Sequence, residues 1–297
     1  VDASYNGLNP NDVAGTNSDD DVAEVIASPL TGLTTTEAGG STTFSVVLTS
    51  QPTAMVTVPL SSSDVTEGTL SRSSVTFDAT NWSTPQLVVT TGFDDAVQDG
   101  DVSYSVLTAA AISADPFYNG INAADRAVVN GDKDVAGVTV TPTSNLITSE
   151  AGGSATFTIV LDTPPSANVR IQVASSNPAE GSVSTARFTF TPANWHTPQT
   201  VTVTGMDDHV IDGDQGYTVT LATAVSGDPH YDGLNPADVT LVNTDDDVAG
   251  VLVTPATGLI TRENGATASF DVVLQSQPTA DVLVALSSSN TAEGSVV

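Results

Sequence analysis

Short runs of alternating apolar and polar residues follow one another along most of the chain. Between residues 135 and 247 they occupy seven segments, at 138–141, 155–161, 169–174, 187–191, 200–204, 217–222 and 239–242. The runs are rich in Val, Thr, Ile and Phe, and clusters of Gly, Pro, Asn and Asp separate them. A period of two indicates strands with one buried face, and no helical period is evident. The pattern therefore predicts an all-β fold.

One set of alternate positions in these strands is expected to face a core. Its members are Phe157, Ile159, Leu161, Phe188, Phe190, Val201, Val203, Tyr217, Val219 and Leu221. Roughly seven strands in just over a hundred residues indicate an immunoglobulin-like sandwich of two sheets. Thr-x-Thr patterns such as Thr202/Thr204 could suggest an ice-binding face. An ordinary solvent face is the preferred interpretation, because Thr is a good strand former.

The chain repeats itself at intervals of 113 residues. Glu37, Glu150 and Glu263 share this spacing, and so do Trp82 and Trp195. A period of this length is the size of a whole domain, so the sequence predicts tandem seven-stranded β-sandwiches in a linear array. The expected segments are the end of a preceding repeat at 1–21, complete repeats at 22–134 and 135–247, and the first half of another at 248–297. We expect the two partial copies to be completed by a longer chain or by neighbours in a filament.

Charge is strongly unbalanced but sparse. The chain has 35 Asp and Glu residues against 6 Lys and Arg, a net charge of −29, yet 39% of its residues are hydrophobic. A disordered acidic tail would be poorer in apolar residues. The charge argues against nucleic acid and anionic membranes as partners, and no apolar run approaches the roughly 20 residues of a membrane span. The absence of cysteine excludes disulfides and Cys-based metal sites.

The acidic residues of the second complete repeat cluster in three segments. They are Glu150, the loop 206–214 with its four aspartates, and the run Asp245–Asp247. In a seven-stranded sandwich these segments are expected at one end of the domain. Gathered carboxylates repel one another, and Ca²⁺ would neutralise them with flexible oxygen coordination. Mg²⁺ fits less well, zinc and copper lack their usual ligands, and the alternative is that these are ordinary turn residues.

The same segments resemble Calx-β domains. The resemblance rests on the Glu-Ala-Gly-Gly turn, the Asp-Asp-x₃-Asp-Gly-Asp loop and the terminal acidic run, and it covers both complete repeats and the fragments. It implies a Ca²⁺ site with ligands from these segments and from an acid in the loop between the third and fourth strands. The implied ligands are Glu37, Asp64, Asp94, Asp95, Asp99, Asp132 and Asp134 in the first repeat, and Glu150, Asp207, Asp208, Asp212, Asp245, Asp246 and Asp247 in the second.

The chain departs from the family pattern where acidic charge is lost. Asn177 stands at the position of Asp64, Lys133 interrupts the first terminal run, and Val102 and Gln215 replace acids. We therefore expect fewer or weaker ions than in a high-affinity sensor, with affinity suited to roughly 10⁻⁴–10⁻³ M calcium.

No catalytic set is evident, and we expect no enzymatic activity. His196, His209 and His230 lack counterparts in the first repeat and are interpreted as exposed loop residues. The preferred function is a calcium-binding structural repeat of a secreted or surface protein, bacterial by resemblance, forming a calcium-stiffened rod, filament or adhesin stalk whose partners are neighbouring repeats. A polysaccharide- or surface-binding module using Trp82 and Trp195 is the alternative, and a calcium sensor comes third.

One further motif leaves two interpretations open. Tyr118 and Tyr231 lie in matching loops before the last strand of each repeat. They either pack within their own domain or dock against the calcium-binding end of the preceding one.

Overall fold

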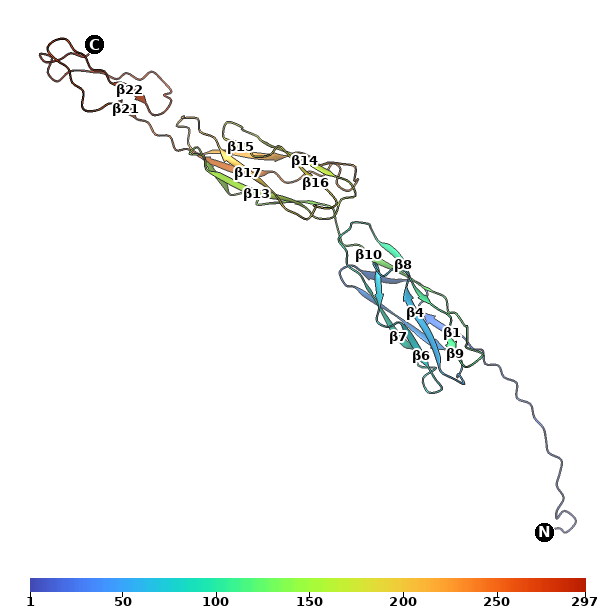
Figure 1. The fold of residues 1–297 in the computed structure, drawn as a ribbon. Helices are drawn as coiled ribbons and strands as arrows, with labels where there is room; N and C mark the ends of the chain where they lie inside the picture. Colours follow the sequence, from blue (N-terminus) through green and yellow to red (C-terminus); the bar gives the residue numbers. More distant parts are fainter. The chain divides into compact units, whose positions relative to one another are not determined.

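The computed structural model describes residues 1–297 and consists of β-strands and loops, with no helix (Figure 1). It contains no helix that could cross a membrane. The chain divides into two compact units, residues 1–133 and 134–297. The four-segment division expected from the repeat stays a prediction, whereas the all-β fold class is confirmed.

The first unit is a sandwich of two sheets. Its strands are β1 (Val25–Ser28), β2 (Leu33–Thr36), β3 (Ser41–Leu48), β4 (Val56–Ser62), β5 (Gly68–Leu70), β6 (Ser74–Phe77), β7 (Gln86–Gly92), β8 (Val102–Thr108), β9 (Ile112–Ser113) and β10 (Arg126–Gly131). One sheet has the order β1-β3-β7-β5 and the other β2-β10-β8-β4-β6, with β9 paired to β4. All pairs are antiparallel except β2 with β10, which is parallel.

The second unit repeats this arrangement. Its strands are β11 (Val138–Thr141), β12 (Leu146–Ser149), β13 (Ser154–Leu161), β14 (Val169–Ser175), β15 (Gly181–Val183), β16 (Arg187–Phe190), β17 (Gln199–Gly205), β18 (Gln215–Leu221), β19 (Val225–Ser226) and β20 (Val239–Thr244). The sheets run β11-β13-β17-β15 and β12-β20-β18-β14-β16, with β19 paired to β14. A separate pair, β21 (Val251–Thr254) and β22 (Asp271–Leu274), follows.

All seven strands predicted for the second repeat are present, and three short ones are additional. These are β12, β15 and β19, which have four, three and two residues. The two shortest contain too few alternations to show a period of two, and β12 is a short strand beside a turn in which the alternation of burial is weak.

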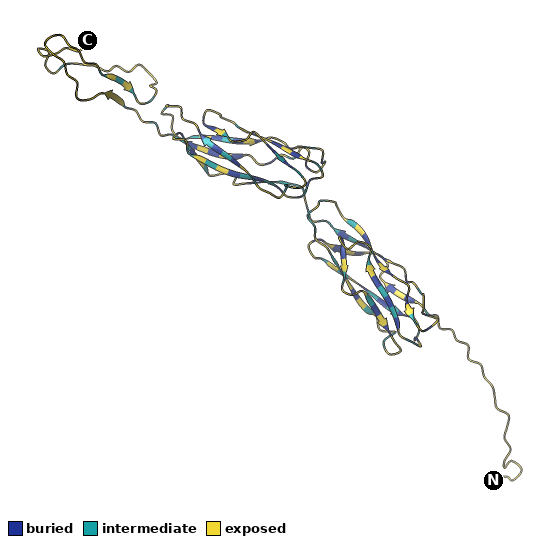
Figure 2. Cartoon of the chain, viewed as in Figure 1, coloured by how far each residue is buried: buried dark blue, intermediate teal, exposed yellow.

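The core lies between the two sheets of each sandwich, as the alternating burial along the strands shows (Figure 2). All ten predicted core positions are confirmed, because none of them is more than 6% exposed. Buried Phe, Val, Ile and Leu side chains fill the space, and this removal of apolar surface from water is the main stabilising term. The two cores lie within residues 23–128 and 136–241.

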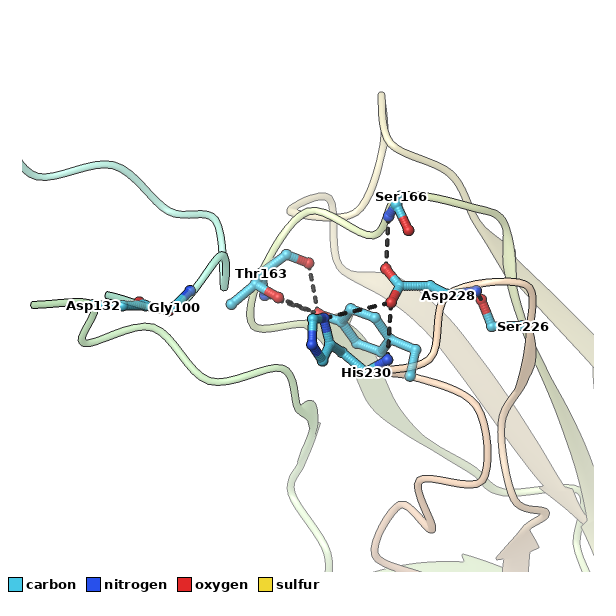
Figure 3. Close-up of polar contacts among 8 residues, drawn as sticks. Gly100, Asp132, Thr163, Ser166, Ser226, Asp228 and His230 are labelled. Atoms are coloured by element: carbon cyan, nitrogen blue, oxygen red, sulfur yellow. Dashed lines mark hydrogen bonds and ion pairs between the residues drawn. The ribbon is translucent and has the colours of Figure 1, made fainter. Parts of the chain in front are cut away.

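The loop before β20 is fastened inside its own domain. The hydroxyl of Tyr231, a fully buried residue, accepts a hydrogen bond from Thr163 N (3.0 Å) and donates one to Thr163 O (2.6 Å). Asp228 accepts hydrogen bonds from the amides of Ser166 (2.7 Å) and His230 (2.9 Å) (Figure 3). Tyr118 makes the same contacts with Ser50. The packing interpretation of the two tyrosines is therefore confirmed, and docking of these loops against the preceding repeat stays a prediction.

Candidate metal centre

Four segments of the second repeat meet at one end of its sandwich. Strands β12 and β20 are parallel, with Ser149 opposite Thr244, so Glu150 and the run Asp245–Asp247 leave the same edge. The end of β17 pairs with the start of β15, and Met206 N donates to Glu180 O (3.1 Å). The loop 206–214 and Glu180 therefore join the other two segments.

Close backbone packing at this end requires a glycine at position 205. Gly205 N donates to Gly153 O (2.9 Å), which ties β17 to the turn after β12. A Cβ atom on Gly205 would collide with the carbonyl oxygen of Ser149 and with Oδ1 of Asn243. Gly92 occupies the matching place in the first repeat and would collide with Thr36 and Asn130. Both repeats thus use the same contact to position their acidic loops.

A buried polar network supports the site from below. Thr148 Oγ1 donates to Asn243 Oδ1 (2.9 Å) and lies 3.0 Å from the Tyr217 hydroxyl. Asn243 Nδ2 in turn donates to Glu180 Oε2 (3.3 Å) and to Met206 O (3.1 Å). The network connects Glu180, which is only 5% exposed, to strands of the sheet. Buried polar groups satisfied in this way fix the geometry around them.

Carboxylates gather above this network in three groups, two of which share Asp247. One group holds Glu150, Asp245 and Asp247, a second Glu180, Asp208 and Asp212, and a third Asp207, His209 and Asp247. Within each group the potential ligand atoms lie within 4.8 Å of one another. We call the carboxylates of these groups, together with Asp246, the acidic end of the second repeat.

Two of these carboxylate oxygens are buried without a hydrogen-bond partner. They are Oε2 of Glu150, a residue 4% exposed, and Oδ2 of Asp247. Burial, reinforced by the charge of Asp245, raises the pKa of Glu150 to about 7. Burial also raises the pKa of Asp247, whereas the amides of Asp247 and Gly213 lower the pKa of Asp245. The acidic end therefore contains carboxylates whose negative charge is poorly neutralised by the protein itself.

The first repeat builds the corresponding end from Glu37, Glu67, Asp94, Asp95, Asp99 and Asp132, which we call its acidic end. Carboxylate oxygens of Glu37 and Asp95 lie within 4.8 Å of each other, and so do those of Glu67, Asp95 and Asp99. Burial raises the pKa of Glu67, and burial with the charge of Asp95 raises the pKa of Asp99. Lys133 Nζ lies 2.6 Å from Asp94 Oδ1, so this end contains its own cation.

The structure brings together most of the residues implied by the resemblance. The groups include Glu37, Asp95, Asp99, Glu150, Asp207, Asp208, Asp212, Asp245 and Asp247. Four others stand differently in this structure. The carboxylate of Asp64 is exposed and binds Thr66, Asp94 pairs with Lys133, Asp132 accepts from Gly100 N, and Asp246 is exposed outside the groups. Asp134 is the first residue of the second unit. Whether any of these residues binds an ion stays a prediction.

Sequence reasoning missed Glu67 and Glu180. Each stands directly before a glycine that begins a short strand, and the two are 113 residues apart. A lone acid before glycine is typical of a turn, so the pattern did not single it out. The signal available was the recurrence of the acid at the repeat interval.

The histidine and tryptophan interpretations can be compared with the geometry. The side chain of His209 is 71% exposed and Nδ1 lies 3.0 Å from Asp207 Oδ1, and the His230 side chain is 51% exposed. Both tryptophans are partly buried and pack against the cores. The main-chain oxygen of Trp195 accepts from Leu161 N (3.2 Å), and that of Trp82 from Leu48 N (3.1 Å). These contacts favour a structural role for both tryptophans.

The donor set at the acidic end of the second repeat suits a hard cation. Its ligands are carboxylate oxygens from four segments, with one exposed imidazole at the margin. The unpartnered oxygens of Glu150 and Asp247 are the atoms that such an ion would satisfy. Ca²⁺ accepts six to eight oxygens in variable geometry, which matches a set of carboxylates supplied by several loops.

Comparisons with known proteins give likenesses of fold. No protein-family model matches the chain, and no curated protein matches it. Among solved structures, CBD12 from CALX1.2 is 12% identical over 73% of this chain and 98% of its own, with a TM-score of 0.35. The apo-form Calx CBD1 domain is 18% identical over 38% and 100%, with a TM-score of 0.31. Domains 4 and 5 of the S-layer protein SbsC are 13% identical over 63% and 75%, with a TM-score of 0.28.

Proposed function

We propose that this chain is a calcium-binding, non-enzymatic structural repeat region of a large secreted or cell-surface protein, in which bound Ca²⁺ stiffens a rod, filament or adhesin stalk. The observation that carries the proposal is the pair of buried, unpartnered carboxylate oxygens of Glu150 and Asp247 within one acidic group. An isolated buried carboxylate is costly, and a bound cation removes that cost.

The residues would share the work of holding the ion. Glu150 and Asp247 would supply the buried oxygens, and Asp245 would be held in its ionised form by the amides of Gly213 and Asp247. Asp208 and Asp212 would come from the loop 206–214, and Glu180 from the polar network. When bound, Ca²⁺ would supply the positive charge and the coordination that join these segments.

Stiffening follows from where the acidic run lies in the chain. Asp245–Asp247 continue directly into Val248, which begins the next repeat, with no linker between them. Without an ion, repulsion among the carboxylates favours an open arrangement of the loops. With an ion, the end of β20, the neighbouring loops and the start of the following repeat would form one rigid body.

The test is thermal unfolding of the full chain with calcium, with magnesium, and with a chelator. A ligand that binds only the folded state at about 100 times its Kd stabilises it by about 2.7 kcal/mol. We expect Ca²⁺ to raise the melting temperature, Mg²⁺ to do so less, and EGTA to reverse the effect. An unchanged melting temperature in EGTA would refute calcium binding.

Variants connect the effect to the proposed site. The double variant Glu150→Gln with Asp247→Asn should lose the calcium response of the second repeat. Asp246→Asn is the matched control, because that carboxylate is exposed and lies outside the groups. Small-angle scattering tests stiffening separately. Ca²⁺ should narrow the distribution of the maximum dimension of the chain. An unchanged distribution would refute stiffening but would not refute calcium binding.

A further inference from the structure

We propose that the outer face of the second repeat carries a binding site for an acidic saccharide, formed around Arg170 and Arg187. The two arginines line an open pocket of about 470 Å³ together with Gln172, Ala222, Thr223 and Val225. The pocket belongs to the six-stranded sheet and is separate from the acidic end of the repeat.

Strand register brings the two arginines to one face. Arg170 and Gln172 alternate outward along β14, while Val169 and Ile171 are buried. Gln172 is paired with Arg187 of β16, and Arg170 is paired with Thr189. Arg170 and Arg187 are thus diagonal neighbours across an antiparallel pair, a separation that long side chains can span. Val225 of β19 is paired with Arg170 on the other side of β14.

Neither guanidinium has a protein partner. The chain contains 35 acidic residues and only 6 basic ones, yet no ion pair or hydrogen bond engages the side chain of Arg170 or Arg187. No acidic residue lines the pocket. Two like charges held side by side repel each other, and a bound oxyanion would relieve this repulsion. Arginine forks also match carboxylate and sulfate groups in a bidentate manner.

Protection of a sheet edge does not account for the pair. Arg187 lies on β16, the edge strand, where a charge discourages pairing with another chain. Arg170, however, lies on the inner strand β14, which is paired on both sides. The matching positions of the first repeat hold Thr57 and Ser74, so the fold itself does not need basic residues here.

The remaining lining favours a sugar as the bearer of the anion. Gln172 and Thr223 offer amide and hydroxyl groups that suit sugar hydroxyls, and Ala222 and Val225 offer aliphatic surface for a ring face. The volume is sufficient for one or two sugar units. A second copy of the chain is a poorer occupant than a short saccharide, because the copy would bring a net charge of −29 to the surface and a short saccharide only a few charges.

The experiment is a binding titration of the full chain, in EDTA, with trigalacturonate and with its uncharged methyl ester, followed by calorimetry. EDTA removes binding through calcium at the acidic end. We expect the acid to bind and the ester not to bind, with affinity that falls as salt is added. Arg170→Ala and Arg187→Ala should each weaken binding about tenfold, whereas Arg72→Ala, an exposed arginine of the first repeat, should change nothing.

Further measurements identify the anionic group that is bound. Titration with a sulfated disaccharide tests whether a sulfate group binds as well as a carboxylate, and binding of either group supports the proposal. Arg170→Lys with Arg187→Lys keeps the charge and the fold but loses the bidentate fork, so it should also weaken binding. Equal binding of acid and ester would overturn the proposal. So would binding of inorganic sulfate as tightly as the sugar, or self-association of the chain that Arg187→Ala abolishes.

Discussion

In the first repeat Lys133 Nζ lies 2.6 Å from Asp94 Oδ1, whereas the matching positions of the second repeat hold Asp246 and Asp207. The strands, the glycine contact and the buried polar network beneath the two acidic ends are otherwise the same. The first acidic end thus contains a lysine, whereas the basic group at the second is the exposed imidazole of His209 beside Asp207. The two repeats therefore share a scaffold, and we expect individual charges at the acidic ends to give them different calcium affinities.

The shared scaffold gives the largest expected effect. Gly205→Ala should destabilise the second repeat by about 3 kcal/mol, because the new methyl group overpacks against Ser149 and Asn243. Gly92→Ala should do the same to the first repeat. Denaturant unfolding of the full chain measures both. Unequal losses would contradict the view that the two ends rest on the same contact, and Gly216→Ala, where a Cβ meets nothing, is the control.

Glu150 gives a pH-dependent effect of intermediate size. The pKa of Glu150 in the folded state is about 7, above its ordinary value of 4.5, so the folded state favours the protonated side chain. This contribution to stability is complete below pH 4.5 and is lost as the pH rises to 7. In calcium-free buffer the wild type should lose about 2 kcal/mol over this range relative to Glu150→Gln. Melting curves from pH 4 to 8 measure the difference. Asp246→Asn should lose stability with rising pH as the wild type does. If the melting temperatures of wild type and Glu150→Gln changed with pH in parallel, the raised pKa of Glu150 would be contradicted.

Exchanging the rim charges should exchange calcium affinities. Asp246→Lys places a cation at the acidic end of the second repeat, and we expect about tenfold weaker Ca²⁺ binding there. Lys133→Asp should strengthen binding at the first repeat by a similar factor, because Asp94 loses its internal partner. Calcium titration calorimetry on each variant decides. Affinities that stay unchanged would mean that the rim charge does not distinguish the repeats.

Asp64 should give the smallest effect. Its carboxylate is exposed and accepts hydrogen bonds from Thr66 N (2.9 Å) and Thr66 Oγ1 (2.6 Å), which lower its pKa. Asn177 makes a similar turn in the second repeat by accepting from Ala179 N (3.3 Å). Asp64→Asn should therefore change the melting temperature by less than about 2 °C and leave calcium affinity unchanged. A clear loss of calcium binding would restore Asp64 as a ligand, and Glu67→Gln provides the contrasting change.

Much of the fold could be predicted because its signals are local and repeated. Alternation identified the long strands and their inward residues, such as Phe157 and Val203, since burial of one face imposes that period. The interval of 113 residues then related the two acidic ends. Short strands such as β15 were missed, because their pairing comes from neighbouring strands rather than from their own sequence.

The site was predicted less completely, for a physical reason. Acids in runs, such as Asp245–Asp247, are conspicuous, but whether a carboxylate joins the groups depends on where the folded backbone places its oxygens. Glu180 joins them because Asn243 holds it beneath the loop, whereas Asp246 lies outside them although Asp245 and Asp247 on either side belong to one group. Neither distinction is written in the local sequence.

The parallel pairing of β12 with β20 has a mechanical consequence. The ladder joins Leu146 to Leu241 and Ser149 to Thr244, and β2 with β10 forms the same ladder in the first repeat. Tension applied to the chain on either side of a repeat pulls these two strands in opposite directions along their length. Their hydrogen bonds would then be loaded together in shear instead of being broken one at a time, so we expect this ladder to resist extension.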